Sequence, residues 1–141
     1  MKNWTEIKHE FETDGSLRDI YIVGASESIW NVFINAVNNS YPCKFFVDGE
    51  EKSLPSSFSA IKGIQNTATT NLAIKIDGGI LVNCHFFSDH QIELDLSPSD
   101  IANTNDFENL QKFMFWLHNL LKLKVVLTHE NGPELEILTV E

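Results

Sequence analysis

The sequence contains no hydrophobic run long enough to cross a bilayer and no pair of closely spaced cysteines. Its amino-terminal stretch, MKNWTEIKHEF, alternates charged and apolar residues and has no continuous apolar region of the kind found in secretion signals. The two cysteines, Cys43 and Cys84, each lie in an apolar segment. They are therefore expected to be reduced core residues rather than a disulfide, and they form no zinc-binding pattern. We expect a cytoplasmic protein without a membrane-spanning segment.

Basic residues are also scarce. Ten Lys and Arg stand against twenty Asp and Glu, which gives a formal net charge of -10. Such a charge repels phosphate backbones, so we expect no nucleic-acid partner. The same charge would speed association with a basic protein, although an acidic composition is also common in proteins that have no such partner. The seven glycines form no phosphate-binding loop or dinucleotide fingerprint, and we assign no cofactor.

Apolar and aromatic residues are abundant enough for a folded core. Hydrophobic residues make up 43% of the 141 positions and include ten Phe and three Trp, which argues against a disordered chain. This length is typical of one domain, and no linker or internal repeat divides it. We predict a single domain over residues 1–141.

Apolar periodicity predicts three helices and about seven strands. A short helix lies around Trp4, a second covers SESIWNVFINAVNNSYP, and the longest runs from about Asn105 to Leu121. The predicted strands are LRDIYIVGA, CKFFV, NLAIKI, ILVNCHFF, QIELDL, KVVLTHE and LEILTVE. Consecutive strands without helices between them predict the α+β class: an antiparallel or mixed sheet on which the long helix of the C-terminal half and two shorter N-terminal helices pack. Residues 48–70 are predicted to form a long loop with one short helical turn.

The stretch NCHFFSDHQIELDL, residues 83–96, combines two histidines and three acids with the alternation of strands. If Asp77-Gly78-Gly79 is a three-residue hairpin loop, every inward pair of that hairpin is apolar and His85 points away from the core. A second three-residue connection, Ser88-Asp89-His90, places His85 opposite Glu93, with Asp95 farther along the same face. The other residues predicted on this face are Lys75, Leu81, Asn83 and Phe87. A last hairpin is expected across Asn131-Gly132-Pro133.

The predicted cluster has a functional and a structural interpretation. It could be a metal site or a histidine that acts as a base, with His129 as a further member if its strand is a neighbour. It could equally be a solvated cross-strand pair. Zinc usually takes at least three protein ligands, and His90 at a turn points poorly into the same site, so the second interpretation is favoured. The apolar Leu81 and Phe87 on this face predict that a loop, a second subunit or a partner covers it.

Two other motifs have structural interpretations. The stretch VGASES places Ser26 between a strand and a helix, as in a nucleophile elbow, but Ser28 stands where the second glycine of that motif belongs. Ser26 is therefore predicted to cap the helix. Arg18 and Asp19 stand at the start of a strand, and Arg18 is predicted to form a local salt bridge within an acidic surface rather than a clamp for a carboxylate or a phosphate.

Several segments together resemble a group of small bacterial proteins. They are DGSLRDIYI, the following helix with Trp30, CHFF leading into IELDLSP, and LTHE near the end. In these segments the chain resembles small uncharacterised bacterial proteins, some of which are similar to immunity proteins of polymorphic toxin systems. The resemblance implies a non-catalytic protein that binds a cognate toxin stoichiometrically through an acidic surface.

The sequence therefore favours an acidic protein-binding module without enzymatic activity. We predict that it binds a basic, toxin-like partner, with no catalytic or metal-binding residue assigned. The predicted binding residues are Glu50, Glu51, His85, Asp89, Glu93 and Asp95. Two alternatives remain open: a small metal-dependent hydrolase or ligand-binding protein centred on His85 and Glu93, and a homodimer formed through the face that bears Leu81 and Phe87.

Overall fold

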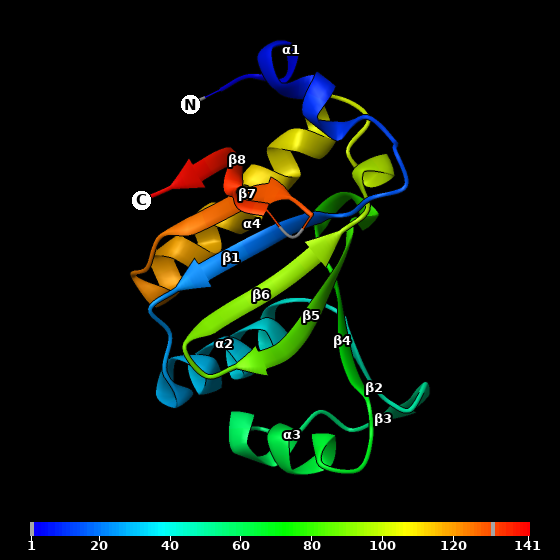
Figure 1. Ribbon diagram of the computed structural model, residues 1–141, viewed down its shortest axis with the longest axis vertical. Helices are drawn as coiled ribbons and strands as arrows, with labels where there is room; N and C mark the ends of the chain where they lie inside the picture. The colour runs from blue at the N-terminus through cyan, green and yellow to red at the C-terminus, as the bar shows by residue number, and fades with distance from the viewer. Residues whose placement is uncertain (1, 131) are drawn as a thin grey trace.

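A single antiparallel sheet of eight strands forms the centre of the molecule (Figure 1). The computed structural model describes residues 2–130 and 132–141. Along the sheet the strands follow the order β3-β2-β4-β5-β6-β1-β7-β8. Their bounds are β1 Arg18–Val23, β2 Cys43–Val47, β3 Glu50–Lys52, β4 Thr70–Lys75, β5 Leu81–Ser88, β6 Gln91–Leu96, β7 Val125–His129 and β8 Gly132–Val140.

Each described α-helix is preceded by a residue whose side chain caps its first turn. The helices are α1 Trp4–Ile7, α2 Glu27–Ser40, α3 Phe58–Gln65 and α4 Thr104–Leu121, with 3-10 turns η1 Lys8–Phe11, η2 Asp77–Gly79 and η3 Pro98–Asp100. The side-chain oxygens of Asn3, Ser26, Ser57 and Asn103 each accept a hydrogen bond from a backbone N–H of the first turn. Each cap satisfies a donor that has no partner within its helix. The predicted role of Ser26 as a cap is thus confirmed.

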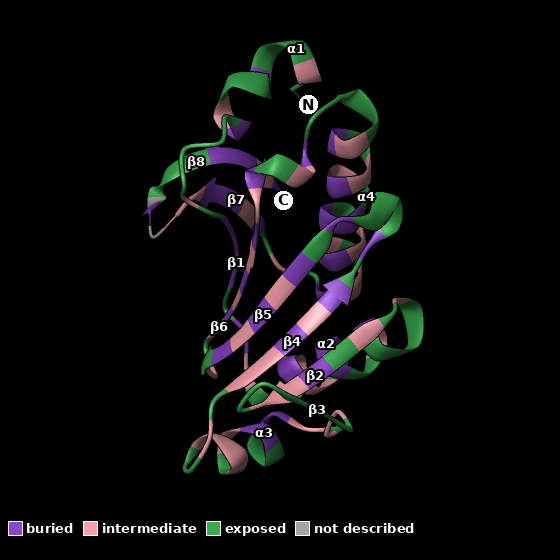
Figure 2. Ribbon diagram, turned by 90° about the vertical axis from the view of Figure 1, so that its right-hand side faces the viewer, coloured by how far each residue is buried: buried purple, intermediate pink, exposed green. Residues whose placement is uncertain are grey.

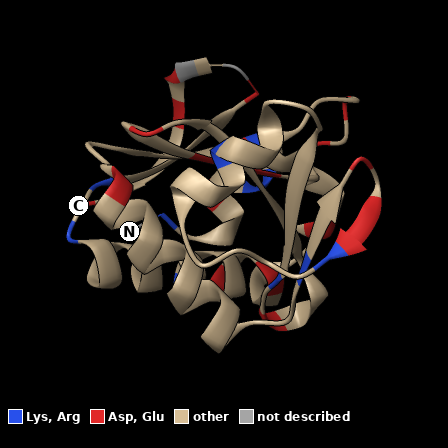
Figure 3. Cartoon of the chain, turned by 90° about the horizontal axis from the view of Figure 1, so that it is seen from below, with Lys and Arg blue, Asp and Glu red and all other residues tan. Residues whose placement is uncertain are grey.

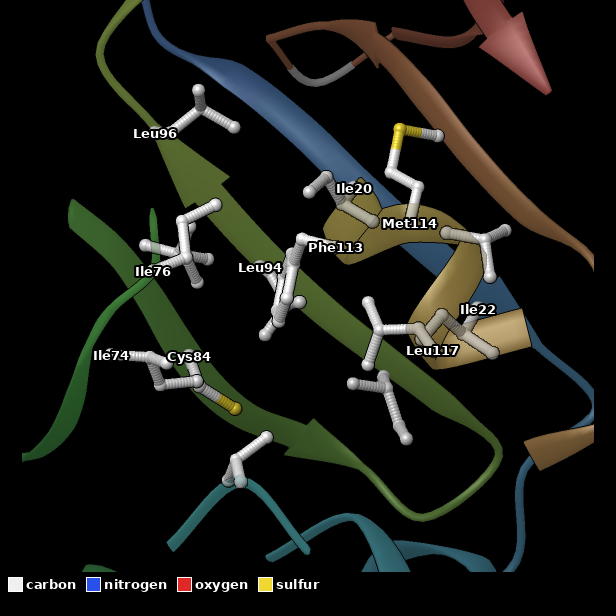
Figure 4. Packing of buried hydrophobic residues seen from close by; sticks show 14 of the residues in the cluster. Ile20, Ile22, Ile74, Ile76, Cys84, Leu94, Leu96, Phe113, Met114 and Leu117 are labelled. Carbon is white, nitrogen blue, oxygen red and sulfur yellow. The ribbon is translucent and has the colours of Figure 1, made fainter. Parts of the chain in front are cut away.

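The apolar side of α4 packs on the middle of the sheet. Figure 4 shows Phe113 and Leu117 of this helix facing Leu94 of β6 and the two isoleucines of β1, Ile20 and Ile22. All five side chains are at most 1% exposed. Burial of a side chain of this size stabilises the fold by about 1.5–3 kcal/mol. The long apolar stripe of α4 therefore holds the sheet's central strands in place.

A second group of contacts attaches α2 and α3 to the hairpin formed by β5 and β6. Trp30 of α2 is fully buried, and its indole N–H donates a 2.9 Å hydrogen bond to the carbonyl oxygen of Ser88. Its ring stacks on Phe58 of α3, with centroids 4.9 Å apart, and lies 5.2 Å from Phe86 of β5. The indole nitrogen is satisfied while the ring fills the core, as a buried tryptophan requires.

The α+β class and the long helix are confirmed, but the segment 48–70 is more ordered than predicted. It contains the strand β3, which makes eight strands instead of seven, and the eight-residue helix α3. Asp48 and Gly49 both adopt positive φ angles and join β2 to β3 in a tight hairpin. β3 consists of Glu50, Glu51 and Lys52, all exposed, so no apolar alternation marks it in the sequence.

The hairpin of β4 and β5 has the predicted register. Leu72 pairs with Cys84 and Ile74 with Val82, and both glycines of the loop adopt positive φ. In the next hairpin, Cys84 lies opposite Leu94 as predicted, but Ser88 pairs with Gln91, so the connection is two residues long. A β-bulge between His85 and Ser88 absorbs the extra residue. The three-residue prediction was wrong because it assumed a continuous register.

The C-terminal hairpin of β7 and β8 is also present, with Leu127 opposite Leu138. Of its predicted turn, Asn131 lies outside the described residues, and Gly132 begins β8. β8 is the last strand of the sheet, at the edge opposite β3.

Candidate functional site

The candidate site lies on the face of the sheet that the helices leave open (Figure 2). Along β5 and β6, buried residues alternate with half-buried or exposed ones, because successive side chains of a strand point to opposite faces. We call the outward side of the sheet the open face. On β1, β5 and β6 it bears Asp19, Tyr21, His85, Phe87, Glu93 and Asp95. As predicted, His85 points away from the core and lies opposite Glu93.

His85 is held by Asp95 rather than by its directly opposed neighbour. Its Nε2 lies 2.5 Å from Oδ2 of Asp95, a residue displaced two positions along β6 from Glu93. The imidazole also stacks on Phe87, with centroids 5.3 Å apart and planes inclined by 8°. The side chains of His85 and Asp95 are 28% and 14% exposed. The histidine is thus positioned from two sides, and Phe87 leaves much of its own ring in solvent at 64% exposure.

β1 adds a carboxylate, Asp19, and a tyrosine hydroxyl, Tyr21, to the same face. Asp19 lies directly opposite Asp95, and Tyr21 directly opposite Glu93. The hydroxyl of Tyr21 donates a 3.0 Å hydrogen bond to Oδ2 of Asp19, and both residues are buried. Burial, followed by this hydrogen bond, raises the pKa of Tyr21 well above its ordinary value. Tyr21 therefore stays protonated and serves as a donor to the carboxylate.

The pKa values of His85 and Glu93 are both raised by their surroundings on the open face. The hydrogen bond with Asp95 raises the pKa of His85, burial opposes this, and the charges of Asp95, Glu93 and Asp19 add to the increase. Burial and the charge of Asp19 raise the pKa of Glu93, which His85 partly offsets. The protonated imidazole is thus favoured next to the acids, as expected for a cation among carboxylates.

The remaining predicted binding residues lie elsewhere. Asp89 is in the turn between β5 and β6, where its Oδ1 is 3.3 Å from Nε2 of His90. Glu50 and Glu51 lie on β3 at the sheet edge, and β2, β4 and β5 separate them from β6. Of the six predicted residues, the open face therefore brings together only His85, Glu93 and Asp95.

His129 does not join His85. It lies on β7, with β1 and β6 between it and β5, and its Nε2 contacts Oε2 of Glu10 at 2.8 Å. The hypothesis of a His85–His129 pair is therefore wrong, because the strand order places the two histidines apart.

The predicted local salt bridge of Arg18 is present, with Asp14 as the partner, but Arg18 itself is buried rather than at the surface. Neighbouring residues of a strand point to opposite faces, and Arg18 is buried at 1% exposure on the helix side. Its guanidinium donates to the carbonyl oxygens of Glu10, Glu12 and Leu17, at 2.7, 3.1 and 3.0 Å, and to the Oγ of Ser16. Its Nη1 also lies 3.6 Å from Oδ1 of Asp14.

Asp19 and Tyr21 are the site residues that sequence reasoning missed. Their spacing of two is visible in the sequence and matches the spacing of Glu93 and Asp95. What was not visible is that β1 pairs with β6, two strands almost seventy residues apart in the chain.

The contacts of these side chains bear on the chemistry that the open face could carry out. No group of three His, Cys, Asp or Glu side chains within residues 2–130 and 132–141 is arranged to hold a metal ion. A histidine hydrogen-bonded to an aspartate can act as a general base, yet Phe87 lies against one side of the imidazole. The acids and the exposed aromatic ring form a surface that can accept cationic side chains.

Acidic residues also occur over the rest of the molecule. Figure 3 shows Asp and Glu on several elements, and the sequence contains half as many Lys and Arg. None of the described helices is both long and apolar enough to span a membrane. In comparisons with known proteins, no family model, curated protein or solved structure matches this chain.

Proposed function

We propose that this protein binds a basic partner protein through the open face of its sheet and has no catalytic role. The observation that supports this most is the position of the half-buried Glu93 and Asp95 on β6, next to the buried Asp19 on β1, in a chain whose net charge is -10. Lysine and arginine side chains of a partner would relieve the repulsion among these acids. Long-range attraction would also speed the encounter.

An exposed aromatic side chain on the same face supplies the second element of a protein interface. Phe87 is 64% exposed and lies on β5, where it stacks on His85 next to the acids of β6. Interfaces typically combine an aromatic anchor with polar groups around it. Phe87 is the anchor that we assign.

The finer proposal is an immunity protein that neutralises a basic toxin. It is supported by the resemblance of DGSLRDIYI, CHFF, IELDLSP and LTHE to small bacterial proteins of that kind, together with the acidic open face. Such a protein acts by stoichiometric binding, which agrees with a site built of acids and an aromatic ring.

The test is an affinity capture with two matched double variants. Three tagged proteins are incubated with a lysate of the source cells: the wild type, E93Q/D95N and the control E27Q/E108Q. The control removes two exposed charges from helices. We expect a basic protein to bind the wild type and the control, to be lost from E93Q/D95N, and to elute as salt rises. The purified pair should then associate in a 1:1 ratio, with an on-rate that falls steeply with ionic strength.

Two results would contradict this proposal. One is equal capture by the open-face variant and the control. The other is a stable dimer of the purified protein that F87S dissociates, because the open face would then be occupied by a second copy. For the finer proposal, co-expression must protect cells from a toxic effect of the captured partner.

A further inference from the structure

Another part of the open face contains a hollow of about 550 Å³ that none of the open-face acids lines. Pro42, Cys43, Lys44, Phe46, Ala73, Lys75 and Leu81, from β2, β4, β5 and the residue before β2, line it. This volume lies within the range of about 300–1,000 Å³ that is usual for small-molecule sites. We call it the lysine-rimmed hollow.

The hollow exists because a small residue lies among large ones. Ala73 on β4 is directly opposite Lys44 of β2, while Phe46 follows two positions along β2 and Leu81 lies opposite Lys75. The methyl group of Ala73 therefore forms the floor, and the longer side chains around it form the walls. An apolar chain placed over Ala73 would contact Phe46 and Leu81, which is 45% exposed.

The rim carries unneutralised positive charge in a strongly acidic protein. Lys44 and Lys75 are exposed, and neither forms an ion pair with any residue in the described part of the chain. The acids that flank them in the hairpin loop and before α4 have other contacts. Asp77 pairs with Lys112 at 2.8 Å, and Asp100 accepts a hydrogen bond from the backbone N–H of Leu81.

We propose that the lysine-rimmed hollow binds a small amphiphilic carboxylate, an apolar chain that ends in one carboxylate group. The chain would lie over Ala73 between Phe46 and Leu81, and the carboxylate would reach the ammonium groups of Lys44 and Lys75. Two flexible ammonium groups without an arginine fork or a glycine-rich loop suit a single carboxylate better than a polyphosphate. This site is separate from the carboxylates of the proposed partner surface, so each proposal can fail alone.

The experiment is a titration of the isotope-labelled protein with decanoate below its micelle concentration, followed by backbone amide NMR shifts. Decanol and acetate serve as matched probes that lack the charge and the chain. We expect saturable shifts at Lys44, Ala73 and Leu81 with decanoate, and at least tenfold weaker binding of the other two probes.

Three variants complete the test. K44Q/K75Q should weaken decanoate binding at least tenfold, and A73L, which fills the hollow at a half-buried position, should abolish it while the remaining amide spectrum stays that of the folded protein. The control K122Q/K124Q, which removes two exposed lysines near the end of α4, should bind like the wild type. The proposal is overturned if K44Q/K75Q binds as tightly as the control, if decanol binds as tightly as decanoate, or if the shifts spread over Val23 and Phe87 instead.

Discussion

At the scale of single residues, two buried or half-buried charged groups are satisfied in different ways. Arg18 is enclosed and donates to three backbone carbonyl oxygens, so it fixes the chain that leads from η1 into β1. His85 lies at the surface and depends on the carboxylate of Asp95. The first arrangement stabilises the fold, while the second makes the open face sensitive to pH.

Substitution of Arg18 should be among the most destabilising changes in this protein. R18M removes the donors of three carbonyl oxygens in a buried place, and we expect it to lower the free energy of unfolding by about 3 kcal/mol. R18K should lose most of this too, because one ammonium group cannot replace the planar fork. Urea unfolding measures both. K112M, which breaks an exposed ion pair with Asp77, should cost less than about 1 kcal/mol, and an equal cost for K112M and R18M would refute the argument.

The contact between His85 and Asp95 should be visible in a titration. The pKa of His85 is raised in the folded protein, so D95N should lower it toward the ordinary histidine value of about 6.5. NMR of the imidazole measures this directly, with D89N, a change next to His90, as the control. An unchanged titration of His85 in D95N would show that Asp95 is not its partner.

The same contact has a stability consequence with a defined sign. Because the folded pKa of His85 is raised, its contribution is fully present below the unfolded value and is lost as the pH rises through the folded value. We therefore expect D95N to cost about 1 kcal/mol at pH of about 5.5 and less at pH of about 8.5, in urea unfolding at both. A cost that grows with pH would contradict this assignment.

At the scale of elements, hairpin loops and helix caps fix the register that places the site. Gly78 has a φ of 82°, and a Cβ there would come within 2.6 Å of the Nδ2 of Asn109 on α4. The positive φ favours glycine at this position, and any other residue would also force the amide end of the Asn109 side chain to shift. In the same loop, Asp77 pairs with Lys112 of α4 and so joins the hairpin of β4 and β5 to the long helix.

Two glycine-to-alanine substitutions should have opposite effects. G78A should destabilise the protein by about 1–2 kcal/mol, because it combines a positive φ with a close contact. G63A, within α3 and with no atom near the added methyl group, should stabilise it by about 0.5–1 kcal/mol through better helix propensity. Thermal unfolding of the two variants measures this, and a shift of the same sign in both would be inconsistent with the conformations described.

At the scale of the whole molecule, charge is the dominant property. The net charge of -10 is spread over many elements, so exposed acids repel one another in the folded state. The acids of the open face are only a part of this field. Their proximity on adjacent strands distinguishes them from the scattered acids of the helices.

Salt should therefore stabilise the isolated protein. Raising NaCl from about 10 mM to about 150 mM shortens the screening length from about 30 Å to about 8 Å, and the melting temperature should rise by a few degrees near pH 7.5. Near the sequence pI of about 4.8, the same change should have a smaller effect. Calorimetry at both pH values tests this, and a melting temperature that falls with salt at the higher pH would contradict it.

Local patterns were sufficient to predict the α+β class, the long helix α4 and the register that sets His85 opposite Glu93. Each follows from interactions between residues close in the chain: apolar spacing, caps and a glycine loop. The strand β3 was not predicted because its three residues are all exposed and polar, so they show no apolar alternation. The bulge after His85 was not predicted because it depends on how β5 and β6 pair with each other.

The sequence by itself determined the chemistry available to this protein: an excess of acids, an aromatic residue on the outward side of a strand, and a histidine among carboxylates. Only the tertiary structure decided which of these groups meet. The strand order depends on packing between segments far apart in the chain, and it brings β1 between β6 and β7. That choice puts Asp19 opposite Asp95, leaves His129 with Glu10, and assembles the open face from strands whose contact no local pattern encodes.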